Sequence, residues 1–143
     1  MQPNINDEVS NNLVLDYMEL HQHLSEKVEE EAKIDFITFV RLMAPKLISD
    51  WKMGKHIEVI SEKLKQLESG EIKRLMVFLP PRSSKSVICS KLFPAWYIGR
   101  NPEHEILTVS HSDQLSSDFG RSVRDLVNEE DFSKIFGGVS LRS

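Results

Sequence analysis

The chain has a single cysteine, Cys89, among its 143 residues. One cysteine excludes an intramolecular disulfide framework, so a reducing cytoplasm is the expected setting. The five histidines have no cysteine partners at metal-ligand spacing, and His21 and His23 would point to different faces of a helix. We therefore expect no metal centre built from histidine and cysteine.

Long apolar runs and basic patches are missing as well. No apolar run approaches the ~20 residues of a membrane span, and the opening MQPNINDEVSNN lacks the basic-then-apolar order of a signal peptide. Residues 1–70 carry 13 acidic and 8 basic side chains, a net charge of −5, whereas residues 71–143 carry 9 and 10, a net charge of +1. The lack of a long apolar run predicts no membrane contact. The charge distribution contains no basic patch that would indicate a nucleic-acid partner.

The first half of the chain predicts helices. We interpret residues 1–9 as a disordered N-terminus and residues 10–69 as a helical lead-in segment. An amphipathic helix is expected from Asn11 to about Ala32, and a shorter buried helix over FITFVRLMAP that Pro45 closes. HIEVISEKLKQLESG repeats apolar residues every three or four positions and stops at Gly70, which indicates a helix with a glycine C-cap.

After Gly70 the apolar period changes. Residues 72–79 and 105–110 are short apolar runs typical of buried parallel strands. The segment between them returns to helical spacing with a kink at Pro94, and a second helix follows residue 110, opened by a serine or aspartate cap. The sequence thus predicts an α/β fold, a partial P-loop NTPase-like βαβα core over residues 70–143 with parallel strands. The final DFSKIFGGVSLRS stops without a closing element, so the domain is expected to be incomplete.

One loop, residues 79–86, holds the candidate phosphate-binding residues. The stretch FLPPRSSKSVIC lies where a phosphate-binding loop sits, between a predicted strand and a predicted helix. The pattern G-x-x-x-x-G-K-[ST] falls on Leu79, Pro80, Pro81, Arg82, Ser83, Ser84, Lys85 and Ser86. The lysine–serine pair matches this pattern, and both glycines are missing.

The departures define two interpretations of the loop. Pro80 and Pro81 have no N–H to donate, and the dihedral angles that glycine adopts freely cost more for Ser84. The backbone N–H groups of Ser83, Ser84, Lys85 and Ser86 remain, and a helix starting near Lys85 would aim its positive end at an anion. The loop is therefore either a phosphate cradle (a divergent Walker A loop), fully working or weakened, or a proline-rich turn between strand and helix.

The surrounding sequence favours the first interpretation. Residues 70–126 hold a strand running into PPRSSKS, then FPAWYIGRNP, a strand ending in Ser-His-Ser, and a helix with FGRSVR. In this order and spacing they resemble the ATPase region of the large subunit of tailed-phage terminases, and FITFVRLMAPKLISDW and KHIEVISEKLKQLESGEIKRL resemble the lead-in helices of that family. The resemblance covers about residues 34–143, and Ser84 replaces the family's glycine.

The resemblance implies the N-terminal part of an ATP-driven DNA-packaging motor of a phage or prophage, acting in the host cytoplasm. By resemblance Lys85 would contact the β- and γ-phosphates of ATP, Ser86 would bind Mg²⁺, and Arg82 would sense the γ-phosphate. His56 would lie on the adenine side, or simply pack at a helix start. Phage DNA, the portal, the terminase small subunit and other copies of the motor subunit would be the partners.

Hydrolysis needs more than this chain offers. No apolar strand ends in the Asp-Glu pair (Walker B) that holds Mg²⁺ and orients water; Asp113 follows its predicted strand only after an interval of Ser-His-Ser. The family's acidic strand and nuclease carboxylates would lie beyond the end of this chain. Arg121 and Arg124, three apart on a predicted helix, are either trans-acting arginine fingers or solvated surface.

Enzymatic activity is therefore left open. One alternative to a packaging-motor fragment is a non-catalytic binding or interaction module that retains the P-loop fold. Another is a small P-loop phosphotransferase, for which neither an acidic base nor a lid segment is visible.

Overall fold

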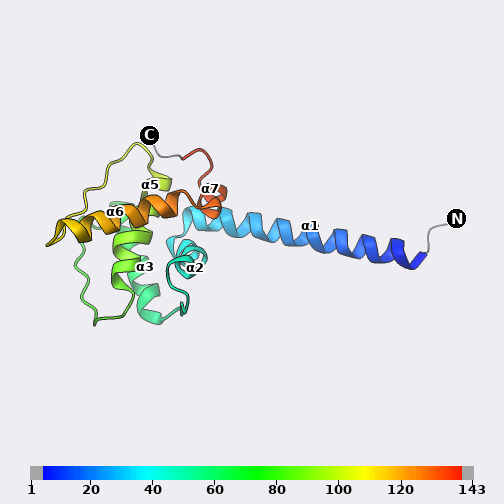
Figure 1. The fold of residues 1–143 in the computed structure, drawn as a ribbon, viewed down its shortest axis with the longest axis horizontal. Coiled ribbons are helices and arrows are strands. Elements are labelled where there is room, and N and C mark those ends of the chain that lie inside the picture. Colours follow the sequence, from blue (N-terminus) through cyan, green and yellow to red (C-terminus); the bar gives the residue numbers. More distant parts are fainter. Residues whose placement is uncertain (1–4, 140–143) are drawn as a thin grey trace.

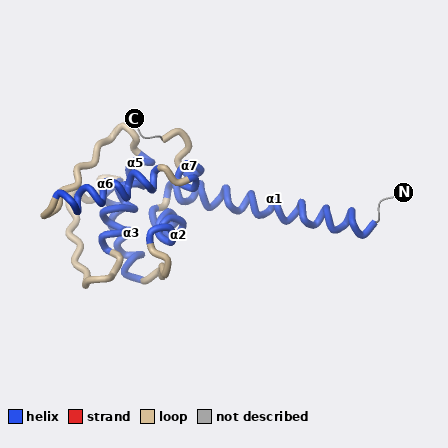
Figure 2. The backbone as a smooth tube through the Cα atoms, in the orientation of Figure 1, coloured by secondary structure: helices blue, strands red, loops and turns tan. Residues whose placement is uncertain are grey.

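The computed structural model describes residues 5–139, and within them it contains helices and extended loops but no β-strand (Figure 1, Figure 2). The elements are α1 (Ile5–Ile34), α2 (Phe36–Leu47), α3 (Lys55–Glu68), α4 (Lys85–Val87), the π-helical turn η1 (Ile88–Leu92), α5 (Phe93–Arg100), α6 (Asp113–Val127) and α7 (Glu130–Ile135). None of these helices is both long and apolar enough to cross a membrane.

The predicted α/β fold with parallel strands is wrong. Residues 72–79 and 105–110 are extended, as expected, but neither pairs with a neighbour, so the described chain is all-helical. The prediction took continuous apolar runs to mean burial on both faces. In the structure Leu75, Val77 and Leu79 pack against the helical core, whereas Met76 and Phe78 are 78% and 81% exposed.

The lack of a sheet has a physical reason. A strand exists only through hydrogen bonds to a neighbouring extended chain. Segments 72–79 and 105–110 lie on either side of a cavity, close enough to line it together but without a ladder between them. Helices cover residues 75–79 from one side only, through Leu75, Val77 and Leu79, and most side chains of residues 105–110 are exposed.

Aromatic side chains form the centre of the helical core. Trp96 on α5 is fully buried, and its indole N–H donates a hydrogen bond of 3.0 Å to the backbone carbonyl of Ala32. Phe36 lies beside it with a ring-centroid distance of 5.2 Å, and Phe39 continues the cluster toward Phe132 on α7. These contacts join the end of α1, α2, α5 and α7 into one body.

Residues 85–100 form one continuous helix with a wide turn in its middle. Pro94 cannot donate a backbone hydrogen bond, and its ring would collide with the carbonyl four residues earlier in a regular α-helix. The backbone widens into η1 just before it, where the N–H of Phe93 reaches the carbonyl of Ile88 five residues back. The kink expected at Pro94 is thus a π turn, and the helix is not broken.

The ends of several helices follow the predicted signals. Gly70 has a φ of +78° just after α3, and its N–H donates to the carbonyl of Leu67, which confirms the glycine cap. Ser112 caps α6 and accepts from the N–H of Leu115. The prediction that Pro45 closes its helix is wrong, since α2 contains Pro45 and continues to Leu47.

The two ends of the chain differ from expectation. Helix α1 begins at Ile5, inside the segment 1–9 predicted to be disordered, and residues 1–4 lie outside the described part. Helix α7 forms where no closing element was expected.

Candidate functional site

The predicted phosphate loop has an unusual backbone. Among the described residues, those other than glycine with positive φ are Arg82, at 63°, and Ser84, at 60°. The left-handed conformation costs an L-residue roughly 1–2 kcal/mol, and such residues gather at functional sites and tight turns. Two of them within three positions make this loop the most strained backbone of the described chain.

A short hydrogen bond closes the loop on itself. The hydroxyl of Ser83 donates to the carbonyl of Pro80 over 2.7 Å. Ser84 then occupies the cap position of the following helix in the left-handed conformation, with no side-chain cap hydrogen bond. A left-handed residue followed by helical ones turns successive backbone N–H groups toward one concave side, the geometry that binds anions.

The concave side of the loop is a cavity of about 380 Å³. The residues that line it are Leu79, Pro80, Pro81, Arg82, Ser83, Ser84, Lys85, Ser86 and Val87. The structure therefore brings the predicted residues from Arg82 to Ser86 together around one space. None of the lining residues is acidic, and two are cationic.

His56 lies against this loop. Its Nε2 atom is 3.3 Å from the backbone carbonyl of Ser83, which ties the start of α3 to the turn. Gly54 leaves room for the ring, because a Cβ on Gly54 would come within 2.7 Å of it. The structure thus places His56 in contact with the loop backbone at the start of α3.

Lys85 also influences the first turn of the helix. Burial raises the pKa of the Cys89 thiol, and the nearby Lys85 ammonium offsets part of that rise. Cys89 is half-buried and packs against the apolar core. It is therefore a protonated packing residue at neutral pH and not a reactive thiolate.

The two arginines of α6 stay outside the loop cavity. Arg121 pairs with Asp118 at 3.0 Å and Arg124 with Asp125 at 3.7 Å, and both arginine side chains are more than half exposed. Neither lines the cavity beside Ser84. Both side chains are thus solvent-exposed in this chain, as a trans-acting finger and a solvated surface residue would each be.

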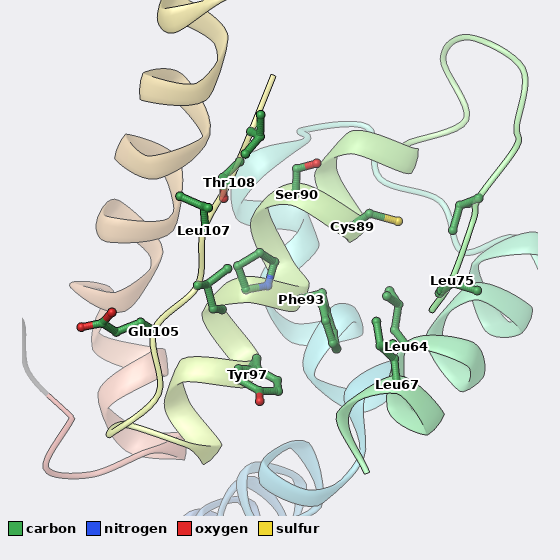
Figure 3. Close-up of a pocket in the computed structure, with 14 residues that line it drawn as sticks. Leu64, Leu67, Leu75, Cys89, Ser90, Phe93, Tyr97, Glu105, Leu107 and Thr108 are labelled. Atoms are coloured by element: carbon green, nitrogen blue, oxygen red, sulfur yellow. The ribbon is translucent and has the colours of Figure 1, made fainter. Parts of the chain in front are cut away.

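Sequence reasoning missed a second cavity, of about 580 Å³, between the two extended segments. Figure 3 shows Leu75 on one side of it and Leu107 on the other, with Phe93 between them. Its walls also include Leu64 and Leu67 of α3, and they are largely apolar. Residues 75–79 are all apolar, so the sequence carried no signal for this cavity; half-buried and exposed residues alternate there only in the structure.

Among residues 5–139 no group of three or more His, Cys, Asp or Glu side chains is placed to hold a metal ion. Comparison with family models, with curated proteins and with solved structures finds no match for this chain.

Proposed function

We propose that residues 80–86 bind the phosphate groups of ATP together with Mg²⁺, as the N-terminal part of a terminase-type packaging ATPase, and that this chain alone does not turn ATP over. The observation that carries the proposal is the pair of left-handed residues, Arg82 and Ser84, directly before Lys85 and Ser86 at a helix start. A backbone strained in this way is maintained only where the surrounding structure requires it.

Each residue of the loop has a defined task in phosphate binding. The backbone N–H groups from Ser83 to Ser86 donate to phosphate oxygens on the concave side. The Lys85 ammonium adds a point charge, and the Arg82 guanidinium offers two parallel donors to a terminal phosphate. The exposed hydroxyl of Ser86 would hold Mg²⁺, which when bound neutralises charge on the phosphates.

The same cavity explains why we expect no turnover. Hydrolysis requires a carboxylate to orient water and a second oxygen ligand for Mg²⁺. No acidic residue lines the loop cavity. Binding and hydrolysis are therefore separable in this chain.

Titration with a fluorescent ATP analogue in the presence of Mg²⁺ tests the proposal. The wild type should bind, and Lys85→Ala should weaken binding by about 10-fold or more, since a charge-assisted hydrogen bond contributes roughly 1.5–3 kcal/mol. Lys91→Ala, on the same helix but outside the cavity, is the matched control and should bind like the wild type. Phosphate release should be equal for the wild type and Lys85→Ala.

Two results would contradict the proposal. Equal binding by wild type and Lys85→Ala would leave the loop as a proline-rich turn. Phosphate release that depends on Mg²⁺ and disappears in Lys85→Ala would mean that a catalytic acid outside the cavity reaches the loop, with Asp113 the first candidate.

A non-catalytic binding or interaction module is the second candidate function. The observation that favours it is the lack of pairing between residues 72–79 and 105–110, because the loop then stands on a single extended segment instead of a sheet. In this case the chain would bind neither ATP nor pyrophosphate, and the titration above would separate the two candidates.

The terminase resemblance also supplies the wider setting of the proposal. Phage DNA, the portal, the small subunit and further motor subunits would be partners of the complete motor in the host cytoplasm. Copurification of this chain with a phage small subunit, compared with the Lys85→Ala variant, tests that part independently of nucleotide binding.

A further inference from the structure

Helix α1 projects away from the rest of the molecule. Figure 1 shows its N-terminal two thirds extending from the body without a neighbour, and only its C-terminal end meets α2, α5 and α7. Every side chain from Leu13 to Val28 is exposed. A single helix in water is marginal without tertiary packing, so a lone α1 of this length lacks its main source of stability.

A continuous apolar stripe runs along this exposed helix, and Val14, Leu15 and Met18 add further exposed apolar side chains on its other sides near the N-terminal end. Leu13, Tyr17, Leu20 and Leu24 follow one another at steps of four, three and four residues, which places them in a single stripe. Their exposed fractions are 64%, 68%, 58% and 52%. Glu19, Glu26 and Glu30 fall on the opposite side of the helix, so most of its negative charge faces away from the stripe.

We infer that α1 pairs with α1 of a second copy of this chain, antiparallel, through this stripe. The symmetric register sets Leu13 opposite Leu24 of the second copy, and Tyr17 opposite Leu20. This gives four layers of large apolar side chains related by a two-fold axis.

Lys27 determines the direction of the pairing. It continues the three–four spacing of the stripe after Leu24 and so falls at an interface position. A parallel pair would place the two Lys27 ammonium groups side by side in the apolar seam. In the antiparallel register they lie at opposite ends of the pair, roughly 25 Å apart at 1.5 Å per residue.

Charge along one flank is complementary in the same register. Asp16 and His23 lie on the same side of the stripe, and both are exposed. Antiparallel pairing sets Asp16 of one copy within half a turn of His23 of the other, so that a carboxylate can accept from an imidazole N–H. This contact occurs twice because the pair is symmetric.

The stripe also runs into a groove on the body. A cavity of about 350 Å³ opens where α1 meets α2 and α7, and its apolar walls are Leu24, Val28, Leu42 and Ile135. In the proposed register the first turns of the second copy's α1 pass beside Val28 and reach this groove. Leu24 and Val28 therefore connect the stripe to the body, beside the polar side chains of His21, Ser25, Glu29 and Asp131 that also line the groove.

The buried area is of the size that a reversible dimer needs. Burying one large apolar side chain removes about 60–120 Å² from water, so the eight stripe side chains of a pair account for roughly 500–1,000 Å². The two flanks and the two grooves bring the total near the ~1,200 Å² at which specific interfaces begin. We expect a dimer with a Kd of roughly 10 µM.

Sedimentation of the full chain over about 1–300 µM tests the inference against that Kd. The wild type should change from monomer to dimer across this range. Leu20→Glu should raise the Kd at least ~100-fold, because each dimer loses two buried leucines and gains two charges in the seam. Leu15→Glu is the matched control, since Leu15 is 56% exposed but lies off the stripe, and it should still dimerise.

Engineered cysteines test the direction in a Cys89→Ser background. Mixing Leu13→Cys with Leu24→Cys should give disulfide-linked heterodimers, whereas either variant alone should not crosslink efficiently. A wild type that stays monomeric at about 300 µM would overturn the inference, since that exceeds the expected Kd about 30-fold. So would equal effects of Leu15→Glu and Leu20→Glu, or Leu13→Cys crosslinking to itself. None of these results depends on nucleotide binding.

Discussion

Replacing Ser84 by glycine measures the strain stored in the loop. Ser84 has φ 60° and ψ 10°, the left-handed conformation, which costs an L-residue roughly 1–2 kcal/mol and glycine almost nothing. Glycine also gains entropy in the unfolded chain, which costs about 0.4–1 kcal/mol. We therefore expect Ser84→Gly to raise the free energy of unfolding by about 0.5–1 kcal/mol, and the melting temperature by roughly 2–4 °C.

The effect on ATP affinity distinguishes a preformed loop from one that forms on binding. Because Ser84 is already left-handed in the free chain, its strain is present before and after phosphate binding and cancels in the affinity. Ser84→Gly should then change the Kd for a fluorescent ATP analogue by less than about threefold. A free loop that left this conformation would instead gain roughly 5- to 10-fold in affinity from the glycine.

Urea unfolding followed by circular dichroism at several temperatures provides the stability measurement. Ser84→Ala is the matched control, because it keeps the β-carbon while removing a hydroxyl that makes no cap hydrogen bond. Alanine should be no more stable than serine. If glycine proves less stable than wild type while alanine is unchanged, Ser84 is not strained and the argument from its backbone fails.

Two further predictions concern the body of the protein. Gly99→Ala should destabilise the fold by about 1–3 kcal/mol, because a β-carbon there would lie 2.5 Å from the buried Phe136 ring. Gly120→Ala, in open space on α6, should stabilise the fold by about 0.5–1 kcal/mol. Thermal melts of both variants check this, and equal shifts in melting temperature would contradict it. The hydrogen bond from Lys46 holds the pKa of Asp131 below its ordinary value of 3.8. Since the folded state then binds fewer protons than the unfolded state, this contribution is complete above about pH 5 and is lost as pH falls through the lowered pKa. The pair is half-exposed, so Asp131→Asn should remove only about 0.3–0.5 kcal/mol at pH 7 and nothing near pH 2; an equal loss at both pH values would refute the assignment.

Local signals in the sequence predicted the end of α3 and the start of α6 correctly. Gly70 and Ser112 act through their own backbone or side chain, so their effect can be read from a few neighbouring residues. Pro94 likewise marks the turn that it distorts. The residues from Arg82 to Ser86 were predicted as a group because they are adjacent in the chain, and adjacency alone brings them around one cavity.

The strands failed because their existence depends on distant partners. The apolar run at 72–79 predicted a strand, which is wrong, because a strand requires a second backbone at hydrogen-bonding distance, which no local pattern specifies. The contact between His56 and Ser83 could not be predicted from the sequence either, because it joins α3 to a loop 27 residues away in the chain. The apolar stripe of α1 was visible in the sequence, but its exposure was not.

The π turn at 88–92 sets the direction in which the loop points. A π turn holds one residue more than an α turn, and each residue of a helix corresponds to a rotation of about 100°. Deleting a single residue between 88 and 92 would leave a regular α-helix up to Pro94, but it would swing Ser84 and Lys85 about 100° around the axis relative to the buried Trp96. The loop would then face away from His56. The orientation of this loop therefore depends on the number of residues in one helical turn as much as on the identity of its side chains.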